Sequence, residues 1–187
     1  MRNYFSITLV ALFFTAGTIT AQDYTRILQS TILSSRSSDG MTAKDMEGLT
    51  IYNQSTNRRG NVEHVYANQM HNGIPIFNAN VSAVFRGETI IHIGDNLQRD
   101  IASRVRTNTA VLTPMQAATK AASLLGAGTA SFSVLETKSS QEVLLNKGGV
   151  SLDEVPVKLV YQLTDDNEFR LAWDLDCLLY TSPSPRD

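Results

Sequence analysis

Three histidines, one cysteine and a run of acids are the side chains that could do metal or nucleophilic chemistry in this chain. A zinc peptidase needs two histidines one helical turn apart with a glutamate between them as general base, the pattern H-E-x-x-H. His64, His71 and His92 do not form that pattern. We expect His64 to be half-buried in a strand, and His71 and His92 to be exposed or hydrogen-bonded. A zinc site assembled from all three in space stays an alternative.

The other candidate groups also lack a reactive arrangement. Cys177 is far in sequence from every histidine, and no G-x-S-x-G motif occurs. Asp165-Asp166-Asn167-Glu168 could hold calcium but lacks the ligand spacing of a calcium loop, so we interpret it as a solvated hairpin turn. The sequence therefore predicts no catalytic, cofactor-binding or metal-ligating residue in this chain, and hence no enzyme activity of its own.

Two basic motifs have a different potential use. Arg58-Arg59 and Arg104-Val105-Arg106 could be cut by a basic-specific protease during maturation. Surface charge is the alternative, and it is the interpretation that the sequence favours for both.

Composition narrows the class of protein. The hydrophobic content of 42% and charged content of 18% are enough for a packed core. The net charge of −2 argues against a nucleic-acid partner, because phosphate binding needs a basic face. A single cysteine cannot form disulfide pairs, so burial alone must stabilise the fold.

Both ends of the chain have the character of non-structural segments. Basic Met1–Asn3 and apolar Tyr4–Phe14, followed by small residues up to Ala21-Gln22, predict a signal peptide rather than a membrane anchor. We therefore expect a secreted protein with no membrane segment after cleavage. Leu178–Asp187 resembles a translated sequencing-adaptor tail, with a flexible Ser/Pro-rich linker as the alternative. On the first interpretation the gene product is incomplete and Cys177, at the junction, is of uncertain origin.

Periodicity predicts a helix and then a sheet in the first half. Apolar residues at helical spacing predict a helix within 22–38, and Thr42 with Asp45 provides a weak signal for another helical turn. We expect strands at 49–53, 62–69, 74–85 and 89–93, with a polar turn region at 53–61. Met70–Gly73 should form the turn, because Asn72-Gly73 provides the positive φ angles of a tight hairpin.

The second half repeats the order of helix and strands. Residues 101–111 are expected to be a connector. Thr113, Pro114 and Gln116 predict a capped helix with an apolar stripe that includes Leu125, ended by Gly126. Strands are predicted at 132–135, 143–145, 155–163 and 169–175. The fold class is therefore α+β, with two small lobes that each consist of an antiparallel sheet with a packed helix.

A group of residues between 64 and 79 resembles a known family. His64-Val65-Tyr66, Gln69, His71–Ile76 and Asn78-Ala79 are similar to the HVY…Q…NGIPV…NA pattern of fungalysin/thermolysin propeptides. More loosely, the alanine-rich helix and the last two strands resemble a PepSY-like lobe. The resemblance covers roughly 41–176. It divides the chain into a signal peptide (1–21), an N-terminal helix and loop (22–40), a propeptide lobe (41–101), a PepSY-like lobe (102–176) and a tail (177–187).

The resemblance implies the pro-region of a secreted fungalysin-family zinc metallopeptidase. Its partner would be the parent's catalytic domain in cis, which would hold the zinc, and it would act as an intramolecular inhibitor and folding aid. Alternatives are a free-standing secreted inhibitor or binding module, or the propeptide-like part of a non-proteolytic surface protein. The candidate site residues are those of the motif: His64, Tyr66, Gln69, Asn72, Gly73, Ile74 and Asn78. We expect Tyr66, Ile74, Ile76 and Phe77 to be buried, and Asn72 and Gly73 to serve the turn.

Overall fold

A computed structural model describes residues 20–178 of the chain. The predicted signal peptide and the adaptor-like tail fall outside the described residues, except for their innermost residues.

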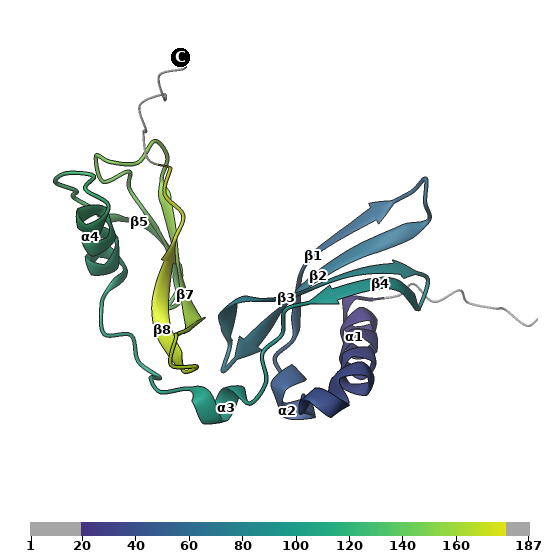
Figure 1. Cartoon of the computed structure of the whole chain (residues 1–187). Coiled ribbons are helices and arrows are strands. Elements are labelled where there is room, and N and C mark those ends of the chain that lie inside the picture. The colour runs from purple at the N-terminus through teal and green to yellow at the C-terminus, as the bar shows by residue number, and fades with distance from the viewer. Residues whose placement is uncertain (1–19, 179–187) are drawn as a thin grey trace, which may run out of the picture.

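Two β-sheet arms meet at an angle in the described part of the chain (Figure 1). The first arm consists of α1 (Ala21–Arg36), the 3-10 turn η1 (Ser37–Asp39), α2 (Ala43–Met46), β1 (Thr50–Asn57), β2 (Val62–His71), β3 (Ile74–Arg86) and β4 (Thr89–Asp95). The short helix α3 (Ile101–Arg104) lies between the arms. The second arm consists of α4 (Pro114–Leu124), β5 (Val134–Ser139), β6 (Glu142–Leu145), β7 (Val155–Leu163) and β8 (Phe169–Leu175).

Each arm is an antiparallel meander, and one parallel contact joins them. Strands β1 to β4 pair in order, and so do β5 to β8. The start of β3 pairs with β7 through Ile76 and Tyr161, which makes one mixed sheet of eight strands. The α+β class is confirmed, whereas the predicted domain boundaries stay predictions.

Helix α1 covers one face of the first sheet. A capping box between Thr20 and Asp23 starts it. Tyr24, Leu28 and Ile32 recur every four residues, so they share one face of the helix, and all three are buried. Their core partners include Phe85, whose ring centroid lies 4.6 Å from that of Tyr24.

A second buried cluster, the junction core, binds the two arms together. Its buried members are Ile74, Ile76 and Ala79 of β3, Ile101 of α3, Leu159 and Tyr161 of β7, and Phe169 of β8. Strand β3 therefore contributes its first half to the junction core and its second half to the core under α1.

Several predicted boundaries in the first arm are wrong in detail. Strand β1 runs on to Asn57, where a polar turn region was expected, because an exposed edge strand needs no apolar alternation. Strand β2 runs on to His71, so the hairpin turn is only Asn72-Gly73. In β3 the alternation of buried and exposed residues breaks at Asn78, whose φ is 59°, so the buried positions change from Ile74 and Ile76 to Ala79 and the residues that alternate with it.

The second arm departs from prediction in three places. The expected connector contains α3. Strand β5 starts at Val134 and not at Phe132, and it is exposed throughout. The capping box of Thr113 and Gln116 forms as predicted, but Leu125 is 66% exposed and does not join the apolar stripe. The stripe ends earlier because Gly126, at φ 67°, turns the chain while Ala127 donates back to the Ala122 carbonyl at 3.0 Å.

Candidate functional site

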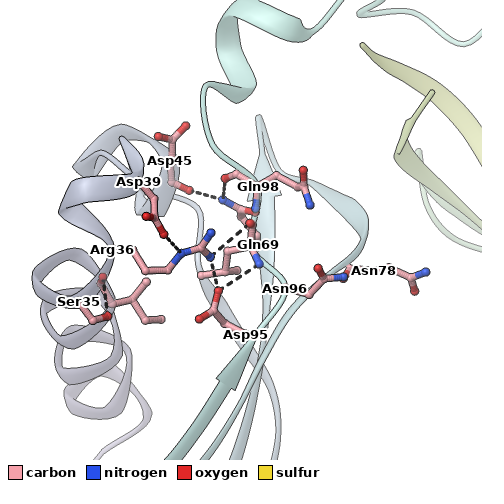
Figure 2. Close-up of polar contacts among 11 residues, drawn as sticks. Ser35, Arg36, Asp39, Asp45, Gln69, Asn78, Asp95, Asn96 and Gln98 are labelled. Atoms are coloured by element: carbon pink, nitrogen blue, oxygen red, sulfur yellow. Dashed lines mark hydrogen bonds and ion pairs between the residues drawn. The ribbon is translucent and has the colours of Figure 1, made fainter. Parts of the chain in front are cut away.

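The side chain of Gln69 is the centre of the motif. It is fully buried, and its amide group makes three hydrogen bonds to the main chain of two other segments (Figure 2). Its Nε2 donates to the carbonyls of Asp45 at 2.8 Å and Gln98 at 2.7 Å, and its Oε1 accepts from the Gln98 N–H at 2.8 Å. Gln69 thus clips the end of α2 and the segment after β4 onto strand β2. A buried amide that is satisfied in this way specifies one arrangement of the three segments.

Asp45 extends this clip towards α3. Its carboxylate closes a capping box with Thr42, whose hydroxyl donates to Oδ2 at 2.7 Å. The other oxygen, Oδ1, accepts from the Ile101 N–H at 3.2 Å. One buried carboxylate therefore fixes the start of α2 and the start of α3, which is the element between the arms.

The segment after β4 is held to α1 and β3 as well (Figure 2). Arg36, near the end of α1, forms an ion pair with Asp95 and a second one with Asp39 at 3.6 Å. Asn96 donates from its main chain to the Asn80 carbonyl at 2.9 Å and from Nδ2 to the Asn78 carbonyl at 2.9 Å. The two hydrogen bonds of Asn96 fix the main chain of β3 around Asn78, where the strand has a bulge.

Backbone conformation explains three other motif positions. Asn72 and Gly73 have φ angles of 51° and 76°, the pair that a tight two-residue hairpin requires, as predicted. Asn78 also lies in the left-handed region, which asparagine tolerates better than most residues. Its role is to form the bulge, and its side chain is exposed.

His64 and Tyr66 lie on the face of the first sheet opposite α1. We call this the open face, made up of His64, Tyr66 and Asn68 of β2 with their neighbours on β1, β3 and β4. The Tyr66 ring lies 6.3 Å from that of Tyr52, which is 58% exposed. The expected burial is confirmed for Ile74 and Ile76. It is wrong for Phe77, which is 38% exposed, and Tyr66 is only half-buried.

The structure does not bring the three histidines together. His64 and His92 flank Val84 from opposite sides across β3, which separates them by two strand spacings, about 10 Å. His71 lies at the other end of β2, where its ring and the Tyr161 ring pack in an edge-to-face arrangement with their centroids 5.6 Å apart. Burial, and to a smaller extent the nearby Lys44, lowers the pKa of His71. Within residues 20–178, no three His, Cys, Asp or Glu side chains are grouped to hold a metal ion.

The acidic turn between β7 and β8 is a hairpin connection. Asp165, Asp166 and Asn167 are exposed. Glu168 accepts hydrogen bonds from Arg106 at 2.8 Å and Arg170 at 3.2 Å, and these two arginines lower the pKa of its carboxyl group. This agrees with the predicted hairpin turn, in which the carboxylate of Glu168 is bound by arginines.

Sequence reasoning missed the partners of Gln69 and one essential glycine. Nothing local marks Gln98, which takes part through its main chain alone. At Gly48, a Cβ atom would lie 2.3 Å from the Met70 carbonyl oxygen, so only glycine lets β1 start this close to β2. The sequence did contain a signal for this close approach, namely a glycine just before a predicted strand.

The first arm is therefore a four-stranded sheet in which the buried Gln69 binds α2 and the segment after β4 to β2. Residues 47–97 of this chain match the family described as the Fungalysin/Thermolysin Propeptide Motif, which confirms the predicted resemblance for the first arm. The match spans all of β1 to β4 and includes every candidate site residue. No curated protein matches the chain. None of the helices described is both long enough and apolar enough to cross a membrane.

Proposed function

We propose that this chain is the pro-region of a secreted fungalysin/thermolysin-type zinc metallopeptidase and acts on its catalytic domain in cis, as an intramolecular inhibitor and folding aid. The observation that carries the proposal is the motif match, which covers one structural unit, the four-stranded sheet of the first arm. The second arm would be its PepSY-like companion.

The physical requirements of such a role are modest. A tethered inhibitor needs only a stable face, because the tether raises its effective concentration to roughly millimolar. The first arm meets this need, since Gln69, Asp45 and α1 fix its sheet from one side and leave the open face uncovered by any described helix. The zinc and the catalytic residues would belong to the domain that it inhibits.

The proposal is tested by refolding a thermolysin-like enzyme from denaturant with and without the purified chain at micromolar concentration. We expect more refolded enzyme and lower peptidase activity when the chain is present. The Tyr66→Ala variant should weaken both effects, whereas Glu88→Ala, an exposed change at a hairpin tip outside the motif residues, should not.

The genomic reading frame provides the second test. A segment with H-E-x-x-H downstream of residue 178 supports a pro-region. A stop codon there favours a free-standing inhibitor, and repeats without zinc ligands favour a surface protein. A frame without H-E-x-x-H, together with no effect on refolding or activity, would overturn the proposal.

A further inference from the structure

The two basic motifs of the chain differ in how their arginines are bonded to the rest of the protein. Arg58 and Arg59 lie in the turn between β1 and β2, at the end of the first arm that is farthest from the junction (Figure 1). Every residue from 52 to 61 is exposed. Among the described residues, neither guanidinium group forms an ion pair or a hydrogen bond.

Arg104 and Arg106 are instead bound in place. Arg104 lies over the Phe169 ring, 4.6 Å from its centroid, and donates from Nε to the Asn167 carbonyl at 2.9 Å. The main chain here is also paired, since the Arg106 N–H donates to the Phe169 carbonyl at 3.1 Å. A protease could not bind this stretch without first detaching it from β8.

We infer that the Arg59–Gly60 peptide bond is a cleavage site for an arginine-specific endopeptidase. Such an enzyme would hydrolyse the bond with one water molecule, leaving a carboxylate on Arg59 and an ammonium group on Gly60. Proteolysis of a folded protein needs a local opening, and exposed loop tips are where it starts. Opening this tip costs little, because the nearest strand pairs join only exposed or half-buried residues. The side-chain hydrogen bonds here are all exposed to water: Thr56 and Gln54 donate to Glu63 at 2.6 and 3.5 Å, and the Gly60 N–H donates to Asn57 Oδ1 at 3.2 Å.

The hairpin between β3 and β4 in the same sheet shows how a neighbouring core residue can protect an arginine from proteolysis. Arg86 also precedes a glycine: it is the last residue of β3, directly before the two-residue turn to β4, and it pairs with Thr89. Its neighbour Phe85 is fully buried in the core under α1. Binding of Arg86 in a protease cleft would therefore pull a core side chain into water, whereas the nearest fully buried residue to Arg59 on β2 is Val65.

A cut at this position would separate α1 from most of the sheet that it covers. The fragment up to Arg59 contains Tyr24, Leu28 and Ile32, while their partner Phe85 stays on the other fragment. The two fragments would then be held only by non-covalent contacts: the buried core, the pairing of β1 with β2, and the bonds that Arg36 and Asp45 make to the second fragment. The stability of the first arm would therefore depend on protein concentration. That the cut begins removal of a pro-region rests on the proposed function, but the cleavage site itself does not.

The test is limited digestion of the purified chain with an arginine-specific endopeptidase, followed by mass spectrometry of the fragments. We expect the first product to begin at Gly60, or at Arg59 when the enzyme cuts after Arg58. The double variant Arg58→Gln/Arg59→Gln should lose this product, and the matched variant Arg86→Gln should keep it at the wild-type rate.

A first cut at any other arginine would overturn the cleavage site, and so would an unchanged rate in the double variant. The nicked protein should elute as one complex from gel filtration and melt at a lower temperature after dilution. A melting temperature that equals that of the intact chain at all concentrations would overturn the consequence for α1. These results do not depend on any peptidase being inhibited, so they are independent of the test of the proposed function.

Discussion

The helices of the two arms differ in how they stabilise their sheets. Helix α1 inserts the large side chains Tyr24, Leu28 and Ile32 into the core of the first arm. Helix α4 buries only Ala118 and Ala122, and it leaves a pocket of about 190 Å³ against its sheet. Because hydrophobic stabilisation scales with the apolar area buried, the first arm should depend strongly on its helix and the second arm only weakly.

The substitution with the largest expected effect on this contrast is Leu28→Ala. Leu28 is fully buried, and removing its side chain leaves a cavity in a packed core, so we expect a loss of about 3 kcal/mol in the free energy of unfolding. In α4 the comparable change, Ala118→Gly, should cost about 1 kcal/mol, mostly through helix propensity. Urea unfolding followed by circular dichroism measures both values.

Hydrogen exchange shows where the loss occurs. Leu28→Ala should speed the exchange of amides in β2 and β3 more than that of amides in β7 and β8. Equal losses for the two variants would remove the contrast between the arms.

The helix with the clearer local start signal, α4, is not the helix that buries more apolar surface. The start of α4 was predicted from Thr113, Pro114 and Gln116, because capping is a local interaction that neighbouring residues determine. Yet this helix contributes little burial. Helix α1 stabilises its arm through contacts with Phe85, which is more than fifty residues away in sequence. No local sequence pattern reveals such contacts.

The candidate site shows the same limit. The Asn72-Gly73 turn could be predicted because the φ angles it needs are a property of those two residues. The burial of Gln69 was not predicted, because its three hydrogen-bond partners are main-chain groups in distant segments. The expected burial of Phe77 was wrong because Phe77 lies on the face of β3 opposite to that of the buried Ile76. The alternation then breaks at Asn78, and the buried positions continue from Ala79.

The second prediction concerns the clip in the first arm. Gln69→Leu keeps a similar volume but leaves the Asp45 carbonyl and both main-chain groups of Gln98 without their partner. We expect a loss of about 2 kcal/mol in the free energy of unfolding. Gln98→Ala is the matched control, because it keeps the main-chain groups that Gln69 binds, and it should cost less than about 0.5 kcal/mol. Similar losses for the two variants in urea unfolding would show that the amide hydrogen bonds are not what stabilises the first arm.

The third prediction concerns the weaker helix. Ala121 lines the pocket between α4 and its sheet, together with Phe132, Val155 and Leu175. Ala121→Leu should fill part of this space and raise the free energy of unfolding by about 1 kcal/mol. Lys120→Leu, on the exposed side of the same helix, should change it by less than about 0.5 kcal/mol. A destabilised Ala121→Leu variant in thermal unfolding would mean that the pocket has no room for a larger side chain.

The smallest expected effect lies where the arms meet, at His71. Burial lowers the pKa of this imidazole from its ordinary value of 6.5, and Lys44 lowers it further. The unfolded chain therefore binds a proton at His71 at a higher pH than the folded chain does. The contribution of neutral His71 is fully present above pH 6.5 and is lost as the pH falls from there through the lowered pKa of the folded state.

His71→Gln should consequently flatten the dependence of stability on pH between 7.5 and 5, measured as the difference from wild type in urea unfolding at each pH. Lys44→Gln removes only the smaller cause, so it should flatten the curve less. The Glu168 carboxyl, whose pKa its arginine partners lower, is common to all three proteins and titrates in a more acidic range, so it cancels in the comparison. A His71→Gln curve parallel to that of wild type would show that the histidine at the Tyr161 edge does not link the junction to pH.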